Sequence, residues 1–189
     1  GHITSIATNG SIIKNLGFNG SASGVTSEQK EMIKQSESVG LFGLTNGASI
    51  SNIKIEINGT VEGDVYTGSL IGQAIDTEIR NVSVKGSVKG NQYVGGVVGR
   101  ISSSSGNSDE RTSVIEDVNV NDIAVYSTTA GTRSAVGGIV GKAENTIIAD
   151  VSVKTNTGSG RHIYGNDDYV GGIVGILNNS DLYNSIVTS

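Results

Sequence analysis

The sequence of 189 residues contains no cysteine, no proline and no tryptophan, and only 16% of its residues are charged. Without cysteine the chain can form neither a disulfide framework nor a thiolate metal site, and it has no thiol nucleophile. Its apolar runs are all shorter than the ~18 residues that suggest a membrane-spanning helix, which predicts no membrane insertion. The net charge of −5 argues against nucleic acid as a partner.

Glycine is abundant, with 28 residues in the chain, where average usage is about 7%. Many of the glycines recur in a hexapeptide that reads Val-Gly-Gly-Val-Val-Gly or a close variant. It occupies residues 38–43, 67–72, 94–99, 136–141 and 170–175. We interpret these glycines as small residues that close packing requires, and not as part of a phosphate-binding loop. Five copies of one motif indicate an internal repeat, and repeats of this length are typical of stacked solenoids.

A second motif follows the hexapeptides and reads apolar, any residue, Asn or Asp, apolar, any residue, apolar. An additional copy begins at Ile13, so the polar member occurs six times: Asn15, Asn52, Asn81, Asp117, Asp150 and Asn184. Because Asn and Asp adopt turn conformations with positive φ most easily, we expect these residues to form a stacked ladder at one corner of the repeat. The alternative is a row of ligand or metal groups, which only the acidic pair Asp117 and Asp150 suggests.

Each repeat also alternates apolar and polar residues with the period of a half-buried strand, as residues 82–89 illustrate. One repeat of roughly 28 residues cannot enclose a core alone, but stacked copies can. Equivalent strands then pair in parallel, and parallel crossovers are nearly always right-handed. We therefore predict an all-β fold, a right-handed parallel β-helix of about six coils, with residues 1–189 as a single domain.

Two further columns are expected from the position of the hexapeptide. Tyr66, Tyr93 and Tyr169 each precede one copy, which predicts a stacked tyrosine column interrupted by Ala135. Strict alternation within the hexapeptide directs one apolar residue per copy away from the core: Leu41, Leu70, Val97, Ile139 and Ile173. This strip would be a bulge, a harmless exposed surface, or a surface that another part of the protein covers.

The hexapeptide and the Ile-x-Asn-Val-x-Val-x-Gly motif resemble the GLUG-type repeat of Gram-positive bacterial surface proteins, among them immunoglobulin A protease-type zinc metallopeptidases and several adhesins. The resemblance covers nearly the whole chain, although residues 1–7 lack the hexapeptide and Ser185 replaces an inward apolar residue. It implies an extracellular or cell-surface, non-catalytic β-helical part of a larger bacterial protein, with no cofactor. Adjacent domains of the same polypeptide are the implied partners, and the parent protein would be such a metallopeptidase or an adhesin.

The residues themselves predict neither a catalytic nor a metal site. Zinc peptidases need two histidines one helical turn apart beside a glutamate, whereas this chain has only His2 and His162. Glycoside hydrolysis needs two carboxylates at a controlled separation. The acidic pairs at 116–117 and 167–168 are adjacent in sequence, so in a strand their side chains would point to opposite faces.

Insertions between the repeats supply the candidate ligand-binding residues. Residues 25–37, 124–134 and 155–168 each lengthen a coil at the same point, so we expect them to project from one edge of the solenoid. Their side chains suited to a ligand are Arg133, Arg161, His162, Tyr164, Asp167 and Asp168. If these residues bind, the alternative function is an adhesin or glycan-binding β-helix, with a host protein or a glycan as partner. Ordinary loop variation is the other interpretation.

Overall fold

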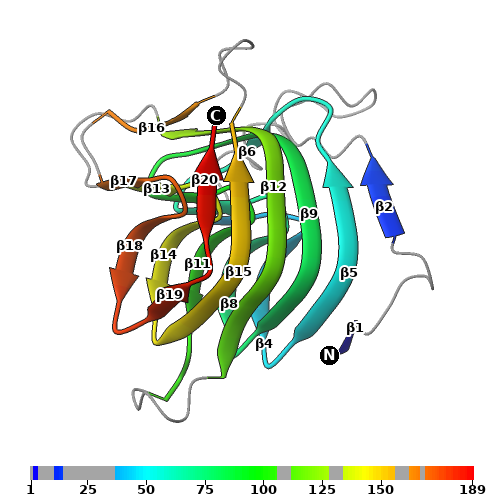
Figure 1. Cartoon of the computed structure of the whole chain (residues 1–189), viewed down its shortest axis with the longest axis vertical. Helices are drawn as coiled ribbons and strands as arrows, with labels where there is room; N and C mark the ends of the chain where they lie inside the picture. Colours follow the sequence, from blue (N-terminus) through cyan, green and yellow to red (C-terminus); the bar gives the residue numbers. More distant parts are fainter. Residues whose placement is uncertain are drawn as a thin grey trace.

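A computed structural model describes residues 2–3, 11–14, 37–105, 112–127, 134–155, 162–166 and 169–189. Within these residues the protein is all-β, contains no helix, and arranges its strands in three parallel sheets (Figure 1). The described part of the chain accordingly offers no helix with the length and apolar character needed to cross a membrane. The predicted all-β class is confirmed.

The largest sheet, here called the long sheet, has ten strands. Its main path runs through β1 (His2–Ile3), β5 (Ser49–Glu56), β9 (Glu78–Gly90), β12 (Ser113–Ser127), β15 (Thr146–Lys154) and β19 (Asp181–Tyr183). The remaining strands each pair with one of these: β2 (Ser11–Lys14), β6 (Val61–Glu62), β16 (Ile163–Tyr164) and β20 (Ile186–Thr188).

Two five-stranded sheets complete the described structure. The first short sheet has the order β17 (Tyr169–Gly171), β13 (Ala135–Gly137), β10 (Tyr93–Gly95), β7 (Tyr66–Gly68) and β3 (Ser38–Val39). The second short sheet has the order β18 (Val174–Asn178), β14 (Val140–Glu144), β11 (Val98–Ser102), β8 (Ile71–Ile75) and β4 (Phe42–Asn46).

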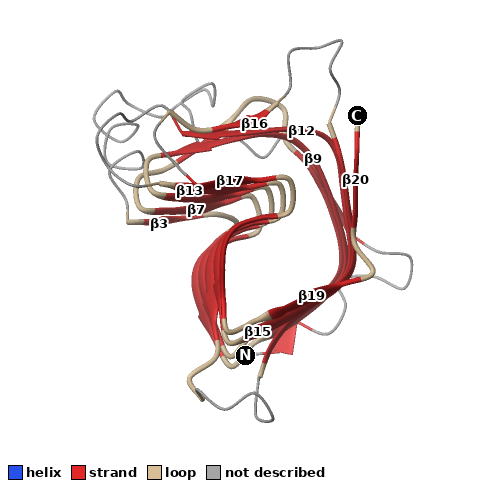
Figure 2. Ribbon diagram, turned by 60° about the vertical axis from the view of Figure 1, so that its left-hand side comes forward, coloured by secondary structure: helices blue, strands red, loops and turns tan. Residues whose placement is uncertain are grey.

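From β3 onward the chain visits the sheets in a fixed order: first short sheet, second short sheet, long sheet, and then the first short sheet again. We call one such passage a circuit. Successive circuits pair in register, so that Ile115 of β12 lies opposite Ile79 of β9 and Ile148 of β15. Figure 2 shows the long sheet curving around the stack, with the first short sheet beneath its upper arm. This arrangement is compatible with the predicted β-helix.

The interior of the stack consists of apolar columns to which each circuit contributes an equivalent residue. The long sheet supplies a column of fully buried isoleucines: Ile50, Ile79, Ile115 and Ile148. A second column lies three residues further along the chain: Ile53, Val82, Val118 and Val151. Full burial of such a side chain stabilises the folded state by about 1.5–3 kcal/mol relative to exposure, and these columns supply the core.

The hexapeptide is a bend between two sheets and not a single strand. In the copy at residues 94–99, β10 ends at Gly95 and β11 begins at Val98, and Val97 lies in the bend between them. The change of direction turns Val94, Val97 and Val98 all into the core. The prediction that one residue per copy points outward is therefore wrong: Leu70, Val97 and Ile139 are fully buried, and Leu41 and Ile173 pack partly buried against the core.

Glycine is required at this bend because the backbones of the two short sheets touch there. A Cβ atom at Gly95 would lie 2.0 Å from the carbonyl oxygen of Val98. At Gly137 it would lie equally close, 2.0 Å from the carbonyl oxygen of Val140. Real Cβ atoms do not approach a backbone oxygen so closely, so the interpretation of the glycines as close-packing residues is confirmed.

The N-terminal edge departs from the repeat pattern. The motif that begins at Ile13 predicts Ile13 opposite Ile50 and Asn15 opposite Asn52. Instead, β2 pairs Ile13 with Ile55, while β1 takes the position beside Ile50. Asn15 itself lies outside the described residues. A strand with a period of two can pair in more than one register that keeps isoleucine opposite isoleucine, and the predicted register is wrong for that reason.

Candidate functional site

The Asn/Asp residues of the second motif share one register position of the long sheet. Asn52, Asn81, Asp117, Asp150 and Asn184 all have positive φ, between 49° and 59°. The side-chain amide Nδ2 of Asn81 donates to Oδ1 of Asn52 at 2.6 Å, which joins two circuits. Asp117 and Asp150 are exposed. No group of three His, Asp or Glu residues gathers anywhere in the described ranges, this column included.

A second corner, which the sequence analysis missed, lies where the second short sheet meets the long sheet. Its residues also have positive φ: Gly47, Asp76, Asn145 and Asn179. Asn179 donates from Nδ2 to Oδ1 of Asn145 at 2.6 Å, as in the first corner. The signal that could have revealed it is the recurring pair of Asn or Asp followed by Ser or Thr, at 76–77, 145–146 and 179–180.

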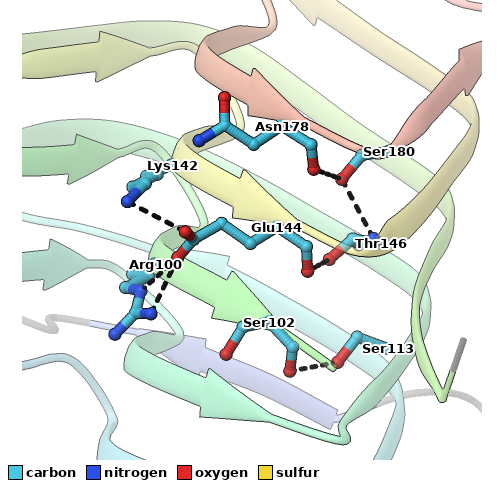
Figure 3. Close-up of polar contacts among 8 residues, drawn as sticks. All are labelled: Arg100, Ser102, Ser113, Lys142, Glu144, Thr146, Asn178 and Ser180. Carbon is cyan, nitrogen blue, oxygen red and sulfur yellow. Dashed lines mark hydrogen bonds and ion pairs between the residues drawn. The ribbon is translucent and has the colours of Figure 1, made fainter. Parts of the chain in front are cut away.

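A hydroxyl column follows this second corner. Each hydroxyl donates to a nearby backbone carbonyl oxygen at the end of the preceding strand. Thr77 donates to Ile75, and Figure 3 shows the other three bonds: Ser113 to Ser102, Thr146 to Glu144 and Ser180 to Asn178. The hydroxyl of Ser180 also accepts the backbone N–H of Thr146 at 3.0 Å. The corner therefore satisfies its buried backbone groups with side chains, which makes it a structural element.

Asp76 makes the main side-chain contacts between residues 103–105 and residue 112. Its carboxylate accepts the backbone N–H of Ser104 at 2.7 Å and the hydroxyls of Ser104 and Thr112. The Ser104 hydroxyl, then the Thr112 hydroxyl and the Ser104 amide, lower the pKa of Asp76 below its ordinary value. Asp76 thus ties residues on both sides of positions 106–111, which lie outside the described residues.

The tyrosine column is present on the outer face of the first short sheet. The rings of Tyr66 and Tyr93 stack with centroids 5.6 Å apart and an interplanar angle of 11°. Ala135 and Tyr169 follow at the same register position, so the predicted column and its interruption are confirmed.

Two cations from the second short sheet lie over these rings. The guanidinium of Arg100 is 5.9 Å from the centroid of Tyr66, and the ammonium of Lys142 is 5.6 Å from that of Tyr93. Glu144 accepts from both, at 2.7 Å from Arg100 and 3.0 Å from Lys142 (Figure 3). The cluster therefore links the outer faces of the two short sheets.

Arg100 and Glu144 hold each other in their ionised forms. Burial alone would raise the pKa of Glu144, but Lys142 and Arg100 outweigh burial and lower it. Burial would likewise lower the pKa of Arg100, but the bond to Glu144 and the contact with Tyr66 raise it. Because each charge is engaged by another member, the cluster acts as a clamp between sheets.

The structure describes two of the predicted ligand-binding residues. His162 and Tyr164 are exposed, at the edge of the long sheet's upper arm. The ring of Tyr164 stacks on that of Tyr126, with centroids 5.6 Å apart and an interplanar angle of 2°, a contact that the sequence analysis did not predict. The other four residues lie outside the described ranges: Arg133, Arg161, Asp167 and Asp168.

The insertion at 124–134 is shorter than expected. Residues up to Ser127 continue β12, and Val125 is fully buried opposite Val88. The extra residues of this circuit are partly absorbed by a bulge between Val120 and Ile123, where Asp122 has positive φ. A bulge lengthens one strand without breaking its pairing, so Tyr126 belongs to the sheet and not to a loop.

Comparison of the chain with protein-family models, with curated proteins and with solved structures finds no match.

Proposed function

We propose that this chain is a right-handed parallel β-helix of about six coils, and that it serves as a non-catalytic spacer and docking module of a bacterial surface or secreted protein. The observation that carries the proposal is the repeated circuit. Three sheets recur in a fixed order and register around one apolar interior. Each added circuit then lengthens the stack by one strand spacing, about 4.8 Å.

The side-chain ladders support this structural role. Ion pairs and side-chain hydrogen bonds connect circuits on the outer faces, including the ion pair of Arg80 with Glu116 and the hydrogen bond of Asn81 with Asn52. Arg100 and Glu144 join neighbouring circuits in the same way. Such contacts stiffen a stack along its axis, which is what a spacer needs in order to hold adjacent domains of the same polypeptide apart.

The proposed parent protein comes from the GLUG-type resemblance. It is an immunoglobulin A protease-type zinc metallopeptidase or an adhesin at the cell surface, and in the first case its catalytic residues belong to another part of the polypeptide. The docking partners of the module would then be adjacent domains or a host protein.

Adding circuits tests the spacer. Three extra copies of residues 73–99, inserted after Gly99, repeat one circuit from Gly72 to its equivalent. We expect a folded protein whose small-angle X-ray scattering fits a stack that is about 14 Å longer along the axis on which the circuits follow one another. An insertion of the same residues in scrambled order is the control and should not give this growth. An unfolded repeat variant, or one of unchanged length, would contradict the proposal.

A glycan-binding function is the second candidate, and the stack of Tyr126 and Tyr164 is the observation that favours it. Tyr164 is 44% exposed beside the exposed His162, and aromatic faces of this kind pack against the C–H groups of sugars. The test is a glycan and serum-protein array. Binding that Tyr164→Ala removes and Leu44→Ala preserves would support this candidate, and no binding on either array would reject it.

A further inference from the structure

Tyrosine is the main side chain of this protein that a one-electron oxidant can attack. The chain has no cysteine, no tryptophan and a single methionine, whereas it has six tyrosines. Cysteine and methionine are common targets of oxidation in other proteins. In this chain the arrangement of the tyrosines therefore decides which oxidation product forms.

Four of the six tyrosines form two stacked pairs, and each pair joins two circuits. Tyr66 stacks on Tyr93, and Tyr126 stacks on Tyr164, in both cases with ring centroids 5.6 Å apart. The two other tyrosines stand opposite alanines of the preceding circuit: Tyr169 opposite Ala135, and Tyr183 opposite Ala149. Proximity in the folded protein therefore favours coupling within the stacked pairs.

The rings of Tyr126 and Tyr164 are well placed for a bond between them. β16 lies along the end of β12 in the upper arm (Figure 2), and the two strands run parallel with these residues in register. The ring planes differ by only 2°. Because paired strands lie about 4.8 Å apart, rotation of the side chains can bring a carbon ortho to one hydroxyl against the equivalent carbon of the other ring.

The pair of Tyr66 and Tyr93 is harder to oxidise because it carries positive charge. The guanidinium of Arg100 is 5.9 Å from the ring centroid of Tyr66, and the ammonium of Lys142 is 5.6 Å from that of Tyr93. A cation beside an aromatic ring makes the removal of an electron from that ring less favourable. Oxidation should consequently favour the other pair.

The charge that acts on Tyr126 is negative. Lys89 stands opposite Tyr126 on β9, but its ammonium pairs with the carboxylate of Glu62 at 3.9 Å. Burial raises the pKa of Tyr126, a hydrogen bond with Thr60 opposes this rise, and the charge of Glu62 adds to it. A carboxylate near the phenol favours the loss of an electron, in contrast to the two cations beside the first pair.

We propose that Tyr126 and Tyr164 are a site of oxidative cross-linking, where a haem peroxidase that uses hydrogen peroxide joins two circuits through a dityrosine bond. Each phenol gives up one electron and one proton, which leaves two tyrosyl radicals, and the peroxide is reduced to two water molecules. The radicals form a C–C bond between ortho carbons. Each ortho hydrogen then moves to the phenol oxygen, and the rings become aromatic again. This inference goes beyond the proposed function and does not depend on it.

The bond secures a strand that has little other pairing. β16 consists of Ile163 and Tyr164, and these two residues pair with β12. One further backbone hydrogen bond runs from the N–H of Val125 to the carbonyl oxygen of His162 at 3.0 Å. A covalent bond persists when such hydrogen bonds open, so the cross-link acts as a staple between the two circuits.

Treating the 189-residue chain with a haem peroxidase and limiting hydrogen peroxide, at low protein concentration, tests the inference. We expect the monomer to gain the fluorescence of dityrosine and to lose two hydrogen atoms in mass. Trypsin separates the possible products, because Tyr126 and Tyr164 fall in fragments 112–133 and 162–189, while Tyr66 and Tyr93 fall in 55–80 and 90–100. The major cross-link should join 112–133 to 162–189, and fragmentation spectra should place it at residues 126 and 164.

Tyr164→Phe keeps a ring that can stack but removes the phenol, so it should lose most of this cross-link. The matched control is Tyr169→Phe, in the same tryptic fragment but opposite Ala135, which should keep it. In urea the unfolded chain should lose the preference for this pair. Four results would overturn the inference: no dityrosine within the wild-type monomer, a major cross-link between Tyr66 and Tyr93, a cross-link that Tyr164→Phe leaves intact, or the same products in urea.

Discussion

At the scale of single residues, positive φ explains why inward residues in the long sheet are sometimes three apart and not two. Ile50 and Ile53 are both buried, although simple alternation would place them on opposite faces. Asn52 between them has a φ of 59°, which turns the chain and resets the alternation. Asn and Asp adopt this conformation at lower cost than other residues with a side chain.

Replacing Asn81 measures how much this corner contributes to the stability of the folded protein. Asn81→Ala removes the side-chain hydrogen bond to Asn52. It also places an alanine at a φ of 50°, a backbone conformation that asparagine adopts more easily than alanine. We therefore expect the free energy of unfolding to fall by about 2 kcal/mol. Asn81→Gly loses the same bond but accepts the backbone angle, and should cost less. Urea denaturation compares the two, and an alanine variant as stable as the glycine variant would contradict this explanation.

Thr67 is a buried threonine at a position where the other circuits have valine. It is fully buried where the equivalent residues are Val39, Val94 and Val136, and its hydroxyl has no hydrogen-bond partner. Thr67→Val is isosteric and removes an unsatisfied hydroxyl, so we expect stabilisation by about 1 kcal/mol or more. Thr77→Val is the control, because the Thr77 hydroxyl bonds to Thr45 and Ile75 and its loss should destabilise. Thermal or urea unfolding checks both.

At the scale of elements, the short sheets are held together by contacts that no single strand contains. Backbone contact at the glycine bend brings β10 against β11, and the clamp of Arg100, Lys142 and Glu144 spans the outer faces. The glycines of the bend recur in successive circuits, whereas the clamp joins two neighbouring circuits, since Ser102 and Asn178 occupy the positions equivalent to Glu144.

Gly95→Ala should disrupt the bend. The new Cβ would meet the carbonyl oxygen of Val98 at 2.0 Å, and backbone cannot move aside as a side chain could. We expect the free energy of unfolding to fall by several kcal/mol, which is more than most single substitutions cause. Gly47→Ala is the control, since no atom lies within 4 Å and only its φ of +63° opposes a side chain, at a cost of about 1–2 kcal/mol. Equal losses in denaturation experiments would argue against a close-packing role for Gly95.

Asp76 makes the second corner sensitive to acid. Its pKa in the folded state is lowered, so it binds its proton less readily than in the unfolded chain. Its contribution to stability is therefore present above about pH 4, the unfolded range of an aspartate, and is lost as the pH falls through the lower folded pKa. Asp76→Asn keeps a residue suited to positive φ and should lose this dependence. Unfolding free energies between pH 2 and 6 should fall more steeply for the wild type.

At the scale of the whole molecule, stability is distributed along the stack. Each circuit forms its strand pairs only with neighbouring circuits, as in other repeat proteins, so in the described stack the outer circuits have one such neighbour and the inner circuits have two. We expect hydrogen exchange to be slowest in β9 and β12, where every inward apolar side chain is buried, and fastest in β19 and β20. Uniform exchange rates would indicate a single cooperative unit with no such gradient.

The class of the fold could be predicted from local pattern because its causes are local. The alternation of apolar and polar residues, and the tolerance of Asn and Asp for positive φ, depend on only a few neighbouring residues. The strands of the long sheet and the Asn/Asp residues of its first corner can therefore be predicted from the sequence. The same holds for the tyrosines, because each directly precedes a hexapeptide, although the hexapeptides themselves are unequally spaced.

The burial of Val97, the pairing of Ile13 with Ile55, and the position of Arg100 over Tyr66 were decided only in three dimensions. Each depends on which distant backbone lies alongside. The prediction from alternating residues assumes that the hexapeptide is one straight strand. In the structure the two short sheets meet there, the chain bends at glycine, and Val97 points inward. By itself the sequence determined the strands and their corners through local backbone preference, while the tertiary structure decided which faces meet, because packing is a relation between segments that the chain order does not contain.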